Sequence, residues 1–307
     1  MKLLFFDDFR LGVLNGETVV DVSDSVADIP RLHPQDLIVG VIEHFSKLRS
    51  KLEAAARQPG QPISQVRIRP PLPRPTNIVC MAVNYMEDGT RSEPAPINAF
   101  QKTAGSIIGD GDTMILPDVA ATIFEGEAEL AVVIGKRASN VAAAEAMGYI
   151  FGYTNFIDGS ARGVPAFYQM KARETFAPIG PYLVTADEIA DVHNLQIQLW
   201  NNGTLMQNFN TNDMAHNIPR CIEWISSLHT LEPGDILATG TNHRGLNPFM
   251  DGDRIELETQ GLGRLHISVR DDLKRTWARQ TRLERQQQGL EGTTPQLTGK
   301  YAPAAVS

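Results

Sequence analysis

The sequence predicts a mainly β protein with helices on its outer faces, which is an α+β fold. Stretches with the apolar pattern of strands are numerous and short, whereas helical stretches are few. The two kinds do not alternate regularly along the chain, which argues against a doubly wound parallel sheet. The 307 residues suffice for one large domain or for one domain with a small appendage.

Residues 1–68 are predicted to form a small N-terminal α/β domain. The segments "KLLFFDD" and "GETVVDVS" have the pattern of short strands, and residues 34–58 have helical spacing. The proline-rich stretch "RPPLPRPTN", residues 69–77, then predicts a stiff linker and a domain boundary.

Residues 78–273 are predicted to form the main domain, in which strands dominate. The strongest local signal is Asn202-Gly203, a pair that favours the tight turn of a β-hairpin. The elements expected, in chain order, are strands at 78–83 and 128–135, a short helix at 140–151 capped by Ser139 or Asn140, a hairpin at 195–209, an amphipathic helix at 213–228, a turn into a strand at 231–241 and a strand pair at 251–271. Residues 274–307 are expected to be a polar extension, partly helical and partly flexible, with the last dozen residues mobile.

The composition bounds the possible partners and location. The net charge is -8 and no basic run precedes residue 274, so nucleic acid is not expected as a partner. No apolar run approaches the roughly 18 residues that span a bilayer, and the first residues lack the pattern of a signal peptide. We therefore expect a cytoplasmic protein without a membrane partner. Cys80 and Cys221 are expected to be buried free thiols.

Three alternating acids in "FEGEAELAVVIGK" point to a cation site. Alternate residues of a strand share one face, so Glu127 and Glu129 would lie side by side, with Glu125 behind them. Carboxylates so close repel unless one holds a proton or a cation lies between them. Asp158 in "NFIDGSARG" is a third oxygen donor, and no Cys/His pairs have zinc spacing, which favours Mg²⁺, Mn²⁺ or Ca²⁺. The alternative is a set of solvated acids at a strand edge.

Several motifs together resemble the fumarylacetoacetate hydrolase (FAH) family. They are "EGEAELAVVIGK", "GYIFGYTNFIDGSAR", "MKARETFAPIGPYLVTADEI", "NTNDM" and "LEPGDILATGT", in the family's order between about residues 70 and 272. The resemblance implies a mixed β-roll with a small N-terminal domain, a homodimer, and bound Mg²⁺ (or Mn²⁺). It implies small-molecule substrates that carry a 2-oxo acid or a 1,3-dicarbonyl group.

The resemblance also assigns roles to individual residues. It makes Glu127, Glu129 and Asp158 the metal ligands, and it places a lysine, Lys171, beside metal and substrate. Further candidate substrate contacts are Tyr85 of the "NY" motif, Arg162 of "SAR", Thr241 of "TGT" and the nearby Arg244. Arg162 could instead form a structural salt bridge with a neighbouring acid, and Lys171 and Arg244 could be surface residues.

One part of the family pattern is different here. Hydrolytic members usually carry a His–Glu pair after "NY" that activates water, but "VNYMEDGTRSE" has Asp88 and Arg91 at those positions. Glu87, Asp88 and His243 are the candidates for the missing base, since a shielded carboxylate or a histidine can accept a proton near neutral pH. Alternatively, Glu87 and Asp88 belong to a solvated acidic loop, and His243 only orients a neighbouring residue.

These residues favour a metal-dependent hydrolase of C–C bonds in acylpyruvates and related 1,3-dicarbonyl 2-oxo acids from aromatic-compound catabolism, acting through a metal-stabilised enolate. The altered dyad keeps open a lyase or isomerase on the same scaffold: a hydratase, decarboxylase or tautomerase acting on 2-oxo-dienoates. A third hypothesis is a non-catalytic family member.

Overall fold

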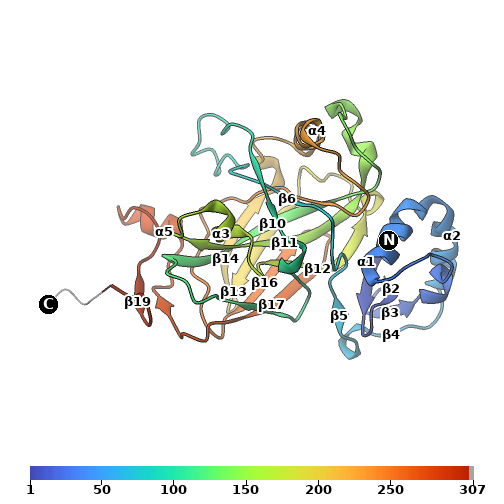
Figure 1. Cartoon of the computed structure of the whole chain (residues 1–307), viewed down its shortest axis with the longest axis horizontal. Coiled ribbons are helices and arrows are strands. Elements are labelled where there is room, and N and C mark those ends of the chain that lie inside the picture. The colour runs from blue at the N-terminus through green and yellow to red at the C-terminus, as the bar shows by residue number, and fades with distance from the viewer. Residues whose placement is uncertain (304–307) are drawn as a thin grey trace.

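A large mixed sheet forms the centre of the molecule. The structure, a computed structural model, describes residues 1–303 (Figure 1). The strand order is β4-β3-β2-β1-β12-β11-β10-β15-β6-β7, with β5 beside β1 and β8 beside β12. The bounds are β1 (Lys2–Phe6), β2 (Arg10–Asn15), β3 (Thr18–Asp21), β4 (Gln61–Pro62), β5 (Ile68–Arg69), β6 (Ile78–Met81), β7 (Ala99–Lys102), β8 (Ile107–Ile108), β10 (Ile123–Ile134), β11 (Ile150–Arg162), β12 (Ala177–Thr185) and β15 (Ile236–Ala238).

A second sheet packs against the first, with the order β14-β13-β16-β17-β9. Its strands are β9 (Thr113–Ile115), β13 (Gln196–Asn201), β14 (Thr204–Asn210), β16 (Arg254–Thr259) and β17 (Arg264–Arg270). The predicted hairpin is confirmed: β13 and β14 pair antiparallel across Asn202 and Gly203, which have φ values of 52° and 77°. Two successive residues with positive φ are typical of the turn that matches the twist of paired strands.

Within residues 1–303, five α-helices lie around the sheets: α1 (Pro34–Glu43), α2 (Phe45–Ala55), α3 (Phe167–Lys171), α4 (Ile218–Leu228) and α5 (Arg282–Gln287). The helical stretch predicted at 34–58 is divided between α1 and α2 at His44. The helix predicted from residue 213 begins only at Ile218, because the Asn217 side chain caps it by accepting from the Arg220 amide. Among residues 1–303, no helix is long and apolar enough to cross a membrane.

A short helix is present within the stretch predicted at 140–151, but it is shorter than predicted, and the predicted cap, Ser139 or Asn140, was wrong. A 3₁₀ helix spans Ala143–Tyr149 without a side-chain cap, and Ile150 already belongs to β11. Asn140 has a left-handed φ of 51°, and its amide donates to the Ser226 carbonyl, so it belongs to a turn and does not cap a helix.

The N-terminal elements extend the large sheet. Strand β1 pairs antiparallel with β12, so β1 to β4 continue the same sheet as β10 and β11. Figure 1 shows these elements with α1 and α2 at one end of the molecule and α5 at the opposite end. The division into domains at 69–77 stays a prediction.

Strand β10 lies between two hydrophobic cores, and its pleat divides its residues between them. Leu130 and Val132 belong to the core shared with the second sheet, whereas Ala131 and Val133 belong to the core under α1 and α2. All twelve residues of β10 are buried. The three glutamates occupy odd positions, so they lie on the same face as Ala131 and Val133, further along the strand. Cys80 and Cys221 are buried free thiols, as predicted.

The C-terminal segment is joined to the main body by a buried ion pair. Strands β18 (Thr276–Trp277) and β19 (Gln296–Thr298) pair, and α5 confirms the expected helical part. Arg275, which is 1% exposed, donates to both carboxylate oxygens of Asp271 and to the carbonyls of Pro117 and Val119. The predicted mobility of the last dozen residues stays a prediction, and 304–307 lie outside the described residues.

Replacing this arginine should destabilise the protein strongly. We expect Arg275→Met to lower the free energy of unfolding by about 3–5 kcal/mol, because Asp271 would stay buried without its partner. The neighbouring Lys274→Met removes an exposed pair with Asp251 and should cost less than about 1 kcal/mol. Urea denaturation of the two variants measures the difference. Equal losses in the free energy of unfolding would contradict the stabilising role assigned to the buried Arg275–Asp271 pair.

Candidate metal centre and active site

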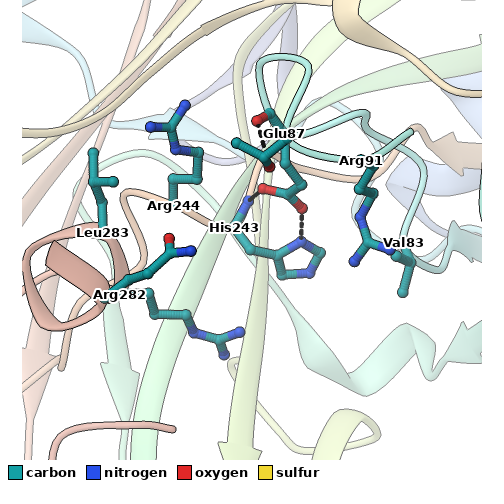
Figure 2. A pocket seen from close by; sticks show the side chains of 9 residues that line it. Val83, Glu87, Arg91, His243, Arg244, Arg282 and Leu283 are labelled. Carbon is teal, nitrogen blue, oxygen red and sulfur yellow. Dashed lines mark hydrogen bonds and ion pairs between the residues drawn. The ribbon is translucent and has the colours of Figure 1, made fainter. Parts of the chain in front are cut away.

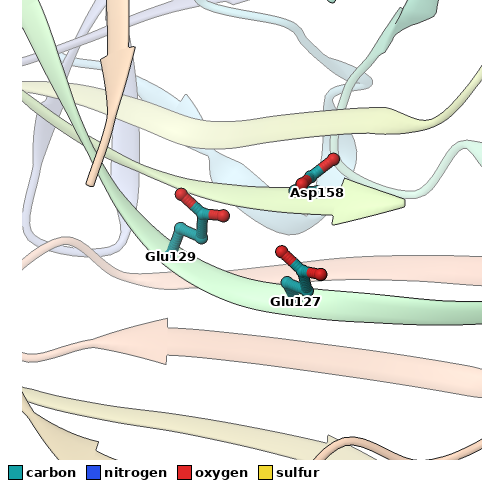
Figure 3. Close-up of side chains that lie close together, drawn as sticks. All are labelled: Glu127, Glu129 and Asp158. Atoms are coloured by element: carbon teal, nitrogen blue, oxygen red, sulfur yellow. The ribbon is translucent and has the colours of Figure 1, made fainter. Parts of the chain in front are cut away.

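Three carboxylates converge where β10 and β11 pair. Glu127 lies directly opposite Asp158 in the antiparallel register, and Glu129 follows two positions along on the same face. One carboxylate oxygen from each residue lies within 4.8 Å of the others. Figure 3 shows the three side chains pointing toward one another, two from β10 and one from β11. The side chains predicted to form a cation site are therefore brought together.

Two glycines on the opposite face hold this strand pair close to its neighbours. Gly126 and Gly159 lie opposite each other in the register. A Cβ atom at Gly126 would lie 2.3 Å from the Phe249 ring, and one at Gly159 would lie 2.8 Å from the Phe176 ring. Only glycine allows such close approach of ring and backbone. The acids thus stand on strands whose other face is tightly packed.

Buried cations surround the acids on the protein side. Lys171, at the end of α3, donates to Asp158, to Glu127 Oε1 at 3.1 Å and to Ser160 Oγ at 2.7 Å. Lys102 has a fully buried side chain and donates to Asp158 Oδ1 at 2.7 Å and to the backbone carbonyl of Lys171 at 2.7 Å. The predicted Lys171 therefore lies against two of the three acids.

Arg162 connects the trio to Glu125. Its Nη2 donates to Glu127, and its Nε donates to Glu125 Oε2 at 2.9 Å. Glu125 is also held by Arg282 of α5, whose Nε donates to its Oε1 at 3.1 Å. Glu125 is therefore neutralised by two arginines, and it is not one of the three converging acids. The salt bridge that was the alternative for Arg162 is present, on the edge of the trio.

The acids differ in how well their charge is compensated. Burial alone would raise the pKa of Glu127, but the charges of Lys171 and Arg162 outweigh it and hold that pKa well below its ordinary value. Burial raises the pKa of Glu129 well above its ordinary value, and the charges of Asp158 and Glu127 raise it further. Among the described residues, Glu129 Oε1 is buried without a hydrogen-bond partner, while Oε2 accepts from the Gly240 amide at 2.7 Å.

This pattern fits a divalent cation. A buried carboxylate oxygen without a donor costs free energy unless something positive contacts it. Glu127, Glu129 and Asp158 offer only oxygen ligands, which are the donors that Mg²⁺, Mn²⁺ and Ca²⁺ prefer. The residues present therefore suit a hard dication, and the unpartnered oxygen of Glu129 is the observation that distinguishes this cluster from an ordinary ion-pair network.

A histidine–glutamate pair lies beside the acids. Glu87 Oε1 lies 2.6 Å from His243 Nδ1, and Glu87 Oε2 accepts from the His243 amide at 2.8 Å. The glutamate side chain is buried and the histidine 21% exposed. Both residues were candidate bases individually, and the structure joins them into one unit. A His–Glu pair is present after all, built from two distant segments and not from one.

This pair faces a cavity of about 370 Å³, which is a suitable size for a small ligand (Figure 2). The other lining residues come from the loop after β6, from the loop after β15 and from α5. They are Val83, Thr90, Arg91, Arg244, Arg282, Leu283 and Gln286. Because Arg282 also binds Glu125, the cavity adjoins the cluster of acids.

The remaining predicted residues lie outside this wall or already have partners. Asp88 is exposed and pairs with Arg244 Nη1 at 2.8 Å. Tyr85 is fully buried and packs edge-to-face on Phe209. The Thr241 hydroxyl is buried and accepts from Gln207 Nε2 at 2.9 Å. The roles predicted for these residues stay predictions.

Sequence reasoning missed two charged residues that shape the site. Lys102 stands in "AFQKTAG" and Arg282 in the polar extension, and neither forms part of a recognisable pattern. Lys102 ends the short strand β7, whose sequence "AFQK" gives no indication that its last residue is buried. Arg282 follows Thr281, which caps α5 in a capping box with Glu284, so a helix start at 281 could have been predicted.

Comparison with known proteins agrees with this geometry. The family model described as "Fumarylacetoacetate (FAA) hydrolase C-terminal" matches residues 77–270. The chain belongs to the fumarylacetoacetate hydrolase family. A maleylpyruvate hydrolase of Aquipseudomonas alcaligenes is 31% identical over 287 residues, which is 88% of this chain and 99% of that relative. A mitochondrial oxaloacetate tautomerase of Rattus norvegicus is 39% identical over 268 residues, 81% of this chain and 82% of the relative.

Among solved structures of this family, a maleylpyruvate hydrolase from Sphingobium sp. SYK-6 in complex with manganese(II) and pyruvate has a TM-score of 0.81. It is 35% identical, and the match covers 88% of this chain and 99% of that one. The predicted family and fold class are confirmed. The relatives are enzymes that differ in the reaction they catalyse.

Proposed function

We propose that this protein hydrolyses a C–C bond in acylpyruvate-type 2-oxo acids, with a divalent cation, Mg²⁺ or Mn²⁺, held by Glu127, Glu129 and Asp158. The observation that carries the proposal is the unpartnered Glu129 Oε1 within a buried acid trio, next to a cavity that holds the Glu87–His243 pair. The manganese and pyruvate bound by the Sphingobium relative support the same class of cofactor and substrate.

His243 and Glu87 act as the base that activates water. Because Glu87 lies against Nδ1, it favours the tautomer in which Nδ1 carries the proton and leaves Nε2 free to accept one. The second Glu87 oxygen binds the His243 amide and fixes the loop, so the ring is oriented as well as polarised. A base oriented by a carboxylate is the arrangement that hydrolytic sites on unrelated folds also use.

The reaction balances with water as the only co-substrate. Nε2 of His243 takes a proton from water, and the oxygen attacks the acyl carbonyl of the substrate. The C–C bond to the pyruvate part breaks, and its electron pair goes to that part, which is protonated and leaves as pyruvate with a carboxylic acid. Lys171 and Arg162 contribute positive charge around the pyruvate end. A bound dication would supply Lewis-acid stabilisation of the developing negative charge.

Product analysis tests the proposal. The purified chain, loaded with Mn²⁺ or Mg²⁺, is offered acetylpyruvate and maleylpyruvate, and the products are followed by NMR. We expect release of pyruvate and the matching carboxylic acid, abolished by a chelator and restored by added metal. Turnover that survives the chelator, or no release of pyruvate from any acylpyruvate, would contradict the proposal.

A second candidate is a tautomerase of 2-oxo acids. The tautomerase relative at 39% identity supports it, and so does the Glu87–His243 pair, which can move a proton between carbon and oxygen without water. The same samples decide between the two. A metal-dependent acceleration of oxaloacetate keto–enol exchange, with acylpyruvates left intact, would favour the tautomerase.

The homodimer remains a prediction from family membership.

A further inference from the structure

The cavity carries one arginine whose charge is not compensated by an acid. Arg244 pairs with Asp88 at 2.8 Å, and Arg282 pairs with Glu125. The only acid in the wall, Glu87, has both oxygens engaged by His243. Within residues 1–303, no ion pair or side-chain hydrogen bond involves Arg91. Its guanidinium is therefore the uncompensated positive charge of a wall that otherwise contains balanced pairs.

The loop that carries Arg91 is held in a strained conformation. Glu87, Asp88 and Gly89 have successive φ values of 57°, 54° and 77°, and a left-handed conformation is unfavourable for residues other than glycine. Hydrogen bonds hold this turn: the Asp88 amide donates to Asp213 at 3.0 Å, and the Arg91 amide donates to the Met86 carbonyl at 3.1 Å. The turn folds the chain back, so Arg91 and the base residue Glu87 line the same cavity.

Figure 2 shows how the three arginines are directed. The side chains of Arg91 and Arg282 extend on the side of the His243 ring, whereas that of Arg244 points away from it. Since Arg282 is bound to Glu125, Arg91 is the arginine that both faces the base and has a free guanidinium. Arg91 is exposed and lines the cavity, so its guanidinium is accessible to an anion that enters beside the base.

We propose that Arg91 forms an anion subsite for the end of the substrate remote from its 2-oxo acid group, and that the preferred substrates are dicarboxylates. The inference rests on the proposed function. The 2-oxo acid group of the substrate would bind the dication held by the acid trio, which would place the reacting carbonyl at His243 and the second carboxylate at Arg91. A guanidinium can bind that carboxylate through two parallel hydrogen bonds. Arg244, a candidate substrate contact in the sequence, is paired with Asp88 and is not assigned this role.

Binding measurements test the subsite without any turnover. The Mn²⁺-loaded full chain is titrated by calorimetry with 2-oxoadipate and with 2-oxohexanoate, which share a six-carbon chain and differ in the terminal carboxylate. The pair 2-oxoglutarate and 2-oxopentanoate tests a shorter reach. We expect the dicarboxylate of at least one pair to bind about 10- to 100-fold tighter, the range for a hydrogen bond to a charged group.

Arg91→Gln should remove this preference, Arg91→Lys should keep part of it, and the binding of the monocarboxylates should stay unchanged. Arg57→Gln is the matched control, because Arg57 is also exposed, has no acid partner among residues 1–303, and lines another cavity. An Arg91→Gln protein that keeps the preference, or a wild-type protein that shows none with either pair, would overturn the inference.

Turnover separates this inference from the proposed function. With maleylpyruvate, Arg91→Gln should raise KM by about 10- to 100-fold with a smaller change in kcat, whereas KM for acetylpyruvate should not move. Equal losses on both substrates would count against the subsite. A protein that prefers dicarboxylates in binding but cleaves no acylpyruvate would support the subsite and contradict the proposed hydrolysis.

Discussion

Glu129→Gln is expected to weaken Mn²⁺ binding by at least about 100-fold and to abolish turnover. Loss of a partner outside the ligand shell already costs 10- to 100-fold in metal affinity, and Glu129 is proposed to be a ligand itself. Its Oε1 is the one carboxylate oxygen of the trio that is buried without a donor among the described residues, so a cation is the contact it lacks. Calorimetric titration of the chelator-treated protein with Mn²⁺ measures the change.

The variant also has a signature in stability. Without metal, glutamine removes a buried carboxylate that Asp158 and Glu127 repel, so the free energy of unfolding in chelator should not fall. With Mn²⁺ at a concentration that saturates only the wild-type protein, the wild type should be stabilised and the variant should not. Glu145→Gln, at an exposed position, is the control and should behave as wild type in both conditions. Undiminished Mn²⁺ affinity in Glu129→Gln would refute the ligand assignment.

The acid trio could be predicted from the sequence because its geometry is local. The alternation Glu127, Glu129 fixes one face of one strand, and only Asp158 had to come from elsewhere, on the next strand of an antiparallel pair. The strands and the hairpin could be predicted for the same reason, since period and turn residues act over a few positions. A short helix was also predicted near Ala143–Tyr149, but its 3₁₀ form was not, because its sequence suits either helical form and the packing decides.

The catalytic pair and the cationic surroundings depend on contacts that no local pattern records. Glu87 and His243 are 156 positions apart, and Lys102 is 56 positions from Asp158. Each pair meets because β6, β10, β11 and β15 belong to one sheet, which places the loops after β6 and β15 at the same end. The order of strands in a sheet cannot be derived from local sequence patterns. Glu87 and His243 could therefore be predicted individually as candidate bases, but their pairing could not.

His243→Ala is expected to lower kcat by roughly 10²- to 10⁴-fold, the range for loss of a general base. Metal affinity should change little, since His243 is not part of the acid trio. Glu87→Gln should give a comparable loss, and the double variant should be hardly worse than either single one, because residues that act as a unit do not contribute additively. Initial rates with an acylpyruvate, at saturating Mn²⁺, measure all three.

The control and a rescue experiment distinguish a base from a structural histidine. His266 on β17 forms a similar pair with Asp110 and does not line the cavity. His266→Ala should therefore leave kcat unchanged. Added imidazole should restore part of the activity of His243→Ala, because a free base can occupy the space of the missing ring, but it should not restore Glu87→Gln, where the ring is present. Fully additive losses of His243→Ala and Glu87→Gln, with no effect of imidazole, would contradict the assignment. The two residues would then have a structural role in the loop after β15, and another group would accept the proton of the attacking water.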